Sequence, residues 1–184
     1  WMGEILFRTK LSENLFKGLS PWMQKLPGGL IHVNVVGCAL FAAISGSSAA
    51  TVATVGKMSI PELRKRNYPE KILLGSLAGS GTLGLLIPPS IILIIYGVAV
   101  QESIAKLFIA GIIPGIMIAL IFMSYVIIWS LINKKEMPKI LEEYSFLEKI
   151  KRSKQLLPVI LLISAVIGSI YTGVATATEA ASLG

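Results

Sequence analysis

Residues 79–90 read Gly-Ser-Gly-Thr-Leu-Gly-Leu-Leu-Ile-Pro-Pro-Ser and lie inside residues 72–101, a stretch without charged side chains. A helix needs about 20 mostly apolar residues to cross the hydrocarbon of a bilayer, and this stretch is long enough. Two adjacent prolines remove two amide donors and clash with the preceding turn. The sequence therefore predicts a membrane helix that is broken near Pro88 and Pro89.

Three further stretches are apolar and long enough to lie in a membrane. They are residues 30–56, 107–132 and 156–184, the last interrupted only by Glu179. Hydrophobic residues make up 54% of the chain and charged residues only 15%, whereas soluble domains carry about 25% charged residues. The composition therefore predicts an all-α integral membrane protein.

The formal net charge is +7, and the basic side chains sit between the apolar stretches. All of the 17 lysines and arginines except Lys106 fall in residues 1–28, 57–71 or 133–154. This clustering is typical of cytoplasmic loops under the positive-inside rule. Basic residues are not interleaved with aromatic residues on a polar face, as a nucleic-acid surface requires. We therefore expect a lipid bilayer and no nucleic acid as a partner.

Residues 29–56 have a basic segment on each side, which a simple crossing would place on opposite faces of the membrane. A re-entrant hairpin keeps both segments on the cytoplasmic side. Its centre, Ser45-Gly46-Ser47-Ser48, offers hydroxyl groups and a flexible backbone for a turn. Irregular backbone at membrane depth is tolerated only inside protein or around a cavity, so this turn should face a site and not lipid.

These patterns divide the chain into consecutive segments. The residue at position 1 is Trp and the last residues stop inside an apolar stretch, so we also expect this to be an internal piece of a longer protein. The predicted segments are an interfacial amphipathic segment at 1–28, a re-entrant hairpin at 29–56, a cytoplasmic basic loop at 57–71, a broken transmembrane helix at 72–101, a transmembrane helix at 104–132, a cytoplasmic amphipathic linker at 133–154 and a transmembrane helix within 155–184.

The two interruptions suggest an ion site. A helix broken in mid-bilayer frees carbonyl oxygens and helix ends, from which secondary transporters build sodium and substrate sites. Hard cations prefer oxygen ligands, which hydroxyl and carbonyl groups supply here without a carboxylate. Small residues can also serve only to let helices approach closely. Two interrupted elements in succession are harder to explain by packing, which favours a site.

A few single residues need separate interpretation. Cys38 is the only cysteine, so no disulfide framework or cysteine metal cluster is expected, and a packing role is predicted. We expect a hydrogen-bonded structural role for His32 and a bond to a nearby backbone group for Asn34. Glu179 is either a functional intramembrane acid or a surface residue.

The sequence resembles the large membrane subunit of tripartite ATP-independent periplasmic (TRAP) transporters, the DctM-like family. The matching motifs occur in order over nearly the whole chain, and together they are specific. They are Gly28-Gly29-Leu-Ile-His32-Val-Asn34-Val, Ala43-Ile-Ser45-Gly46-Ser47-Ser48-Ala-Ala-Thr51, Ile87-Pro88-Pro89-Ser90-Ile, Ile95-Tyr96-Gly97-Val, Leu107-Phe108-Ile-Ala-Gly111-Ile-Ile-Pro114-Gly115 and Tyr171-Thr172-Gly173-Val-Ala-Thr176-Ala-Thr178-Glu179-Ala-Ala.

The resemblance implies an elevator-type transporter of two inverted repeats in a bacterial inner membrane, of which this chain holds about one half and the start of the second repeat. It implies sodium as the coupling ion, no other cofactor, and import of an organic acid such as a C4-dicarboxylate or a sialic acid-like carboxylate. A small membrane subunit and a periplasmic substrate-binding protein would be partners.

The same resemblance assigns candidate residues to this half. Two departures limit the assignment: Ala177 stands where many relatives have proline, and the second hairpin and second proline-broken helix are absent, so the second ion site is not assigned. The sodium-site candidates are Ser45, Gly46, Ser47, Ser48, Thr51, Gly79, Ser80, Thr82, Gly84 and Pro88, and the substrate-binding candidates are Ser48, Pro89 and Ser90.

Other functions remain open at this stage. Another ion-coupled carrier could share the hairpin and broken-helix plan, and a structural membrane subunit could share the composition without needing broken elements. A membrane-embedded enzyme is disfavoured because the sequence has no His-Glu-x-x-His motif, no paired intramembrane aspartates and no second histidine to serve a serine. We therefore expect a transporter and no enzymatic activity.

The hairpin interpretation predicts the accessibility of two loops. Cysteines introduced at Lys25 and Lys65, on a background without Cys38, should both react with a membrane-impermeant thiol reagent from the cytoplasmic side, because both lie in basic segments. The measurement is labelling in intact cells against inverted vesicles. Labelling of the two cysteines from opposite faces would show that residues 29–56 cross the membrane once and do not form a hairpin.

Overall fold

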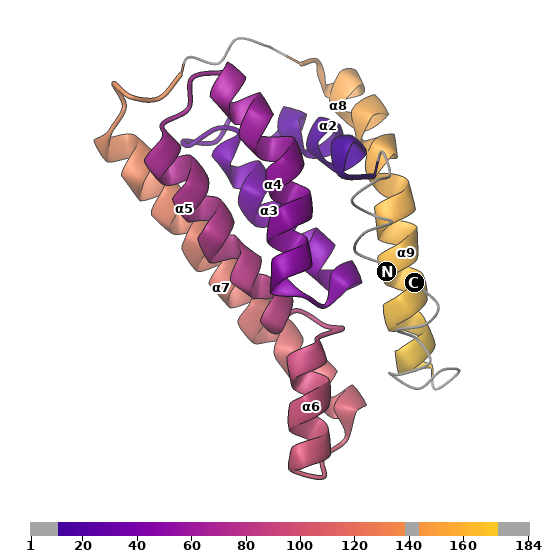
Figure 1. Cartoon of the computed structure of the whole chain (residues 1–184). Helices are drawn as coiled ribbons and strands as arrows, with labels where there is room; N and C mark the ends of the chain where they lie inside the picture. The colour runs from indigo at the N-terminus through magenta and orange to yellow at the C-terminus, as the bar shows by residue number, and fades with distance from the viewer. Residues whose placement is uncertain (1–10, 139–143, 173–184) are drawn as a thin grey trace.

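The computed structural model describes residues 11–138 and 144–172, and every regular element in these ranges is helical (Figure 1). This agrees with the all-α prediction. The α-helices are α2 (Leu11–Met23), α3 (Ile31–Ser45), α4 (Ser48–Lys65), α5 (Glu70–Gly81), α6 (Ile91–Ala99), α7 (Ile104–Ile132), α8 (Phe146–Ser153) and α9 (Leu157–Tyr171), with short 3-10 turns η1 (Thr82–Leu85) and η2 (Lys154–Leu156).

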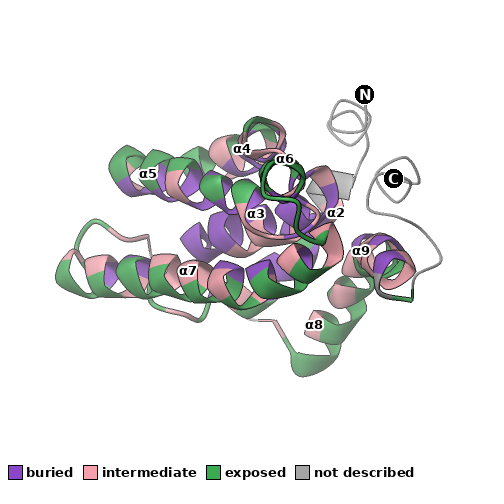
Figure 2. Ribbon diagram, turned by 90° about the horizontal axis from the view of Figure 1, so that it is seen from below, coloured by how far each residue is buried: buried purple, intermediate pink, exposed green. Residues whose placement is uncertain are grey.

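Helix α3 is the centre of the core. It packs against α2, α4, α5 and α7, and most of its side chains are buried (Figure 2). Ile31, Val33 and Phe41 are fully buried, because the helix is apolar around its circumference and not only along one stripe. Cys38 is also fully buried in this core, in agreement with the packing role expected for it.

Helices α3 and α4 form a pair that is joined by Gly46 and Ser47. Gly46 adopts a left-handed conformation, with φ of 58°, and its N–H donates to the Ala42 carbonyl at 3.0 Å. Glycine adopts this conformation without steric cost, so α3 ends there. Ser47 is extended and its hydroxyl oxygen accepts from the Ala50 N–H, which caps α4. The turn lies at the predicted centre of residues 29–56, and the depth of the pair in a membrane stays a prediction.

The predicted boundary between hairpin and basic loop needs correction. Residues 57–65 of the predicted 57–71 loop are helical, because α4 continues to Lys65 with Pro61 inside it. Pro61 is exposed, whereas Ser59 and Leu63 are fully buried, so packing of the inner face outweighs the amide donor that the proline lacks.

An ion pair spans the short connection from α4 to α5. The Arg64 guanidinium donates to both Glu70 carboxylate oxygens, at 2.6 and 3.2 Å. This hydrogen bonding lowers the pKa of Glu70 and raises that of Arg64. Both side chains are more than half exposed, so the pair orients the connection more than it stabilises the fold.

Residues 72–101 form two helices and not one. Helix α5 ends at Gly81, η1 follows, and α6 begins at Ile91, so the helix is interrupted at the two prolines. Helix α6 then turns into α7 around Gln101, which adopts a φ of 55°, and the Glu102 N–H donates to the Gly97 carbonyl at 2.9 Å. Helix α7 covers residues 104–132, the range given to a transmembrane helix, and its crossing of a membrane stays a prediction.

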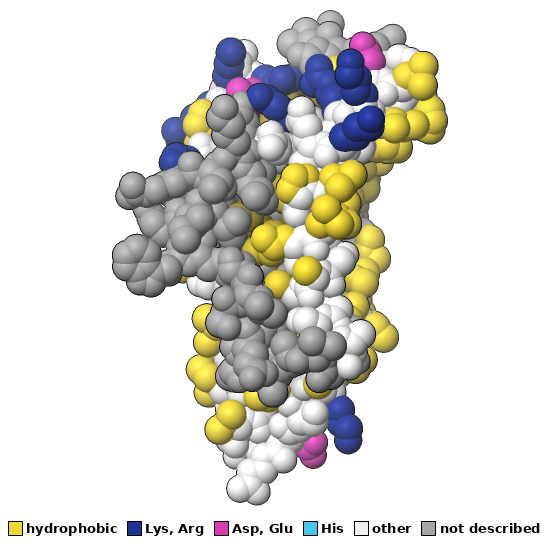
Figure 3. All heavy atoms as spheres, turned by 90° about the vertical axis from the view of Figure 1, so that its right-hand side faces the viewer, with side chains coloured by type: hydrophobic (Ala, Val, Ile, Leu, Met, Phe, Trp, Pro, Cys, Tyr) yellow, Lys and Arg dark blue, Asp and Glu magenta, His cyan; other side chains and the backbone are white. Residues whose placement is uncertain are grey.

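Within the described residues, two helical segments are long and apolar enough to cross a membrane, Ile104–Ile132 and Phe146–Ile170. Their apolar side chains are largely exposed: Ile113 is 76% and Leu120 58% exposed on α7. Figure 3 shows hydrophobic side chains along the face that α8 and α9 occupy. Exposed apolar faces of this extent are typical of surfaces covered by lipid or by another subunit.

The predicted amphipathic segments 1–28 and 133–154 contain α2 and α8, which lie at the same end of the molecule (Figure 1). Trp22 is 41% exposed on α2, and its indole N–H donates to the Ser153 hydroxyl at 2.8 Å. Trp1, Ala177, Glu179 and the predicted start of a second repeat lie outside the described residues.

The extension of α4 predicts a stability effect at Leu63. Leu63→Ala should destabilise the protein by about 2 to 5 kcal/mol, because it leaves a cavity under a fully buried side chain. Reversible unfolding in detergent micelles measures this. Leu147→Ala, at a side chain that is 77% exposed, is the control and should change little; equal effects at the two positions would mean that residues 57–65 do not pack as a helix.

Candidate functional site

The turn between α3 and α4 lies against the break between α5 and α6 (Figure 1). The Ile91 N–H, in the first turn of α6, donates to the Gly46 carbonyl at 3.5 Å. A methyl group on Gly84 would lie 2.9 Å from the backbone of Ser47 and Ser48, and one on Gly46 would lie 2.6 Å from the Pro89 carbonyl oxygen. The two elements that the sequence singled out are therefore in direct backbone contact, which only glycine permits at this distance.

Hydroxyl groups gather on the α3–α4 turn. The Ser45 and Thr51 hydroxyl oxygens are 2.9 Å apart, and the Ser45 hydroxyl also donates to the Ser47 carbonyl at 3.3 Å. Thr51 is fully buried. The Ser48 hydroxyl oxygen is buried too, without a hydrogen-bond partner among the described residues. Such an unsatisfied group costs free energy unless water or an ion contacts it. Among the oxygens of the turn, that of Ser48 is therefore the strongest candidate to contact an ion.

Four helix ends meet where the turn and the break touch. Helices α3 and α5 end here, at Ser45 and Gly81, and helices α4 and α6 begin here, at Ser48 and Ile91. At the end of α5 the chain passes directly into η1, and the Ser76 and Gly79 carbonyls accept from the Ser80 and Thr82 hydroxyls. Helix C-termini carry partial negative charge and helix N-termini carry partial positive charge. The arrangement can therefore attract a cation to one pair of ends and an anion to the other.

Several candidates from the break have other roles. The buried Ser80 hydroxyl donates to the Ser76 carbonyl at 2.5 Å and lies 3.4 Å from the Asn34 carbonyl of α3. Thr82 is exposed, and its hydroxyl donates to the Gly79 carbonyl at 2.6 Å. Gly79 faces Phe122 of α7. These three residues contact helix surfaces, and their interactions are those of helix packing and helix ends.

The prolines and the serine after them occupy different positions in the break. Pro88 is buried and Pro89 is half-buried beside Gly46. The Ser90 hydroxyl donates to the Leu85 carbonyl at 2.6 Å, and its oxygen accepts from the Leu93 N–H at 3.5 Å. Ser90 thereby closes the break and caps α6, so its side chain already has partners within the chain.

Asn34 holds α3 and α5 together at the level of the core. Its side-chain amide donates to the Leu73 carbonyl at 3.2 Å and to the Ser76 hydroxyl at 3.0 Å, and the residue is fully buried. This confirms the expected bond to a backbone group. Sequence reasoning missed that the partner lies on α5; the only signal was an amide side chain in an uncharged stretch.

His32 is also fully buried, with its Nε2 atom 2.7 Å from the Pro27 carbonyl oxygen. This agrees with the structural role expected for it. Within the described ranges, no group of three His, Cys, Asp or Glu side chains is placed to hold a metal ion. Cation binding at this site would therefore rest on hydroxyl and carbonyl oxygens.

The family of the chain follows from comparison with known proteins. The family model of the tripartite ATP-independent periplasmic transporter, DctM component, matches residues 1–184. The chain belongs to the DctM family. This confirms the resemblance and makes the protein an integral membrane permease of a transporter family, not of an enzyme family.

Three relatives illustrate the DctM family. The C4-dicarboxylate TRAP transporter large permease of Pseudomonas aeruginosa is 42% identical over 85% of this chain and 36% of its own length. The sialic acid large permease SiaM of Vibrio cholerae is 35% identical over 98% of this chain and 42% of its length. The isethionate permease DctMQ of Oleidesulfovibrio alaskensis is 36% identical over 94% of this chain and 27% of its own length. The chain spans between about a quarter and two fifths of these relatives.

The close approach at Gly84 predicts a position-specific effect of a methyl group. Gly84→Ala should destabilise the DctM-family chain by about 1 to 3 kcal/mol, because the new atom would meet backbone that cannot rotate away. Reversible unfolding in detergent micelles measures the change. Gly75→Ala is the matched control, since a methyl group there has no neighbour within 4 Å, and equal stability of the two variants would contradict the contact between turn and break.

Proposed function

We propose that the full-length protein is the large membrane subunit of a sodium-coupled TRAP transporter that imports an organic acid across a bacterial inner membrane. A C4-dicarboxylate or a sialic acid-like carboxylate is the proposed class of solute, in line with the names of two relatives. The observation that carries the proposal is the contact of the α3–α4 turn with the α5–α6 break, where four helix ends meet.

Sodium binds, in this proposal, at the ends of α3 and α5. The oxygens of Ser45, Ser48 and Thr51 and the carbonyls at the two helix ends form a ligand set of the kind that hard cations prefer. The buried Ser48 oxygen is the strongest support, because a cation would satisfy it. Gly46, Ser47, Gly79, Ser80, Thr82, Gly84 and Pro88 then shape the site through backbone and packing.

The solute carboxylate binds, in this proposal, on the side of the helix starts. Helices α4 and α6 begin at Ser48 and Ile91, and free amides at helix N-termini attract carboxylates. Ser48, Pro89 and Ser90 would form one wall of this part of the site. Adjacent cation and anion sites would couple the two ligands, because each charge stabilises the other.

Transport requires that the site open to each side of the membrane in turn. We assign the α3–α4 pair to a re-entrant hairpin and α5–α6 to its broken partner, both in the first of two inverted repeats. The chain covers 36% and 42% of the length of two relatives, so the full-length protein would have room for a second repeat. A small membrane subunit and a periplasmic substrate-binding protein complete the proposed transporter, as in the tripartite systems for which the family is named.

Uptake by the full-length protein tests the proposal as a whole. Reconstituted with its small subunit in vesicles, it should accumulate radiolabelled dicarboxylate or sialic acid only with an inward sodium gradient and an added binding protein. Uptake that is independent of sodium would show that sodium is not the coupling ion. Uptake that is independent of a binding protein would favour another carrier with the same helical plan.

The orphaned hydroxyl of Ser48 gives the sharpest single-residue prediction. Ser48→Ala should raise the sodium concentration for half-maximal uptake about fivefold or more. Removal of one ligand weakens sodium binding and, by linkage, solute binding as well. Membrane levels of the protein should not change. The control is Ser124→Ala on α7, whose hydroxyl donates only to the Leu120 carbonyl one turn away. An unaltered sodium dependence in Ser48→Ala would exclude this hydroxyl as a ligand.

A further inference from the structure

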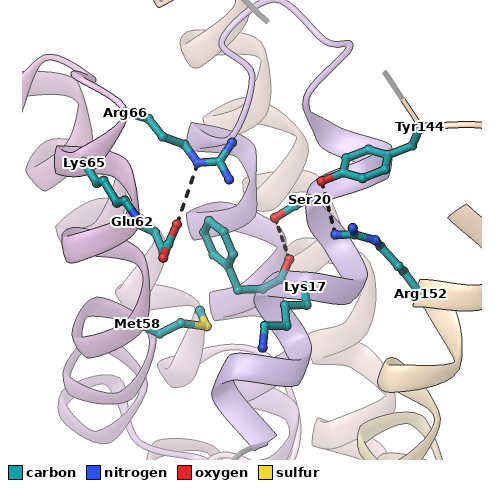
Figure 4. Close-up of a pocket in the computed structure, with 9 residues that line it drawn as sticks. Lys17, Ser20, Met58, Glu62, Lys65, Arg66, Tyr144 and Arg152 are labelled. Carbon is teal, nitrogen blue, oxygen red and sulfur yellow. Dashed lines mark hydrogen bonds and ion pairs between the residues drawn. The ribbon is translucent and has the colours of Figure 1, made fainter. Parts of the chain in front are cut away.

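A cavity lies between three helices (Figure 4), at the end of the molecule opposite α6 (Figure 1). Its volume is about 370 Å³, and α2, the end of α4 and the segment around α8 provide its walls. These helices come from the basic segments 1–28, 57–71 and 133–154, which are far apart in the sequence. The fold thus brings the basic segments together around one space, away from the turn and the break.

The described lining of this cavity is strongly cationic. Lys17, Lys65, Arg66 and Arg152 line it, and Glu62 is the acidic side chain among the described lining residues. The Glu62 carboxylate lies 3.7 Å from the Arg66 guanidinium and is 43% exposed, so solvent screens this ion pair. Such a lining attracts an anion with several oxygen atoms, and the planar guanidinium groups match the geometry of phosphate.

One wall holds its guanidinium in a fixed orientation. The Arg152 side chain donates to the Tyr144 hydroxyl at 3.1 Å and lies 4.3 Å from the centre of the Tyr144 ring. Figure 4 shows both side chains across the cavity from Arg66 and Glu62. An arginine that is oriented in advance loses less conformational entropy when it binds an anion.

Exposed apolar side chains lie on α8, the helix that carries Arg152 of the cavity lining. Phe146 and Leu147 of α8 are 66% and 77% exposed. Trp22 of α2 stacks edge-on with Phe146, and the Lys149 ammonium lies 5.5 Å from the centre of its indole. Figure 3 shows basic side chains gathered at this end, with hydrophobic side chains next to them. Exposed apolar residues, Trp and Lys together are typical of a helix that lies in the membrane interface.

We propose that this cavity binds the phosphate headgroup of an anionic phospholipid, whose acyl chains lie along the apolar face of α8. A soluble anion would use the same cations but would gain nothing from Phe146 and Leu147, and those side chains favour the lipid. Basic pockets on the cytoplasmic side of membrane proteins are suited to anionic headgroups. The bound lipid would tie α8 to α2 and α4 and is independent of sodium and solute.

Lipid retention by the full-length permease tests this proposal. The purified protein is titrated with phosphatidylglycerol in detergent micelles, and bound lipid is counted by native mass spectrometry. Arg66→Gln with Arg152→Gln should weaken retention about 30-fold, since each substitution removes a direct contact between a guanidinium and the headgroup phosphate, with an effect of about fivefold each. Lys134→Gln with Lys135→Gln removes the same charge from exposed residues at the end of α7, outside the cavity lining, and should leave retention unchanged.

Further arms separate the possible outcomes. Phosphatidylcholine should not replace phosphatidylglycerol, and inorganic phosphate at equal ionic strength should not displace it. Displacement by phosphate would show a site for a soluble anion, and equal loss in the control pair would show surface attraction without a site; either result overturns the proposal. If the arginine pair does not fold, Lys17→Gln with Lys65→Gln, at exposed side chains, takes its place, and unchanged retention in that pair would overturn the proposal as well.

Discussion

Each backbone amide and carbonyl that a broken helix frees needs a partner inside the protein, because hydrocarbon offers none. In the α3–α4 turn and the α5–α6 break, part of this demand is met within each interruption and part across their contact. The Gly46 carbonyl accepts from Ile91, the Ser90 hydroxyl donates to the Leu85 carbonyl, and the Ser47 hydroxyl caps α4. Each interruption thus supplies partners for its own ends, and the Ile91–Gly46 bond joins the two.

The contact depends in turn on how α3 and α5 are held together. Asn34 bonds two groups of α5 inside the buried core, where a polar side chain that lost these partners would be costly. Rotation or sliding of α3 against α5 would break these bonds. The core therefore determines which residues of the turn face the break, and Gly46 and Gly84 then allow the backbones to approach.

Local features were predictable from sequence, and long-range ones were not. The prolines at 88 and 89 and the Ser-Gly-Ser-Ser turn act on their own backbone, so the α3–α4 turn and an interruption before α6 could be inferred from them. The end of α5 at Gly81 lies well before the prolines and could not. The course of α4 through Pro61 could not, because it depends on the burial of Leu63 against other helices. Ser80 and Thr82 are chemically suited to bind a cation, yet their hydroxyl groups donate to nearby carbonyls. The clustering of basic residues predicts membrane topology. That these segments lie around one cavity depends on the fold.

The break also contacts α7, and this bears on how the proposed transporter could move. A methyl group on Gly111 would lie 2.8 Å from the Leu86 carbonyl oxygen, and one on Gly115 would lie 2.9 Å from the Ile87 side chain. These glycines are one turn apart on α7. The segment before the prolines, at Leu86 and Ile87, therefore packs directly on the backbone of α7. A close backbone contact of this kind does not slide without loss of packing. In an elevator mechanism, α7 would therefore move together with the broken helix, and the sliding surface would lie on its exposed apolar face, where Ile113 and Leu120 project.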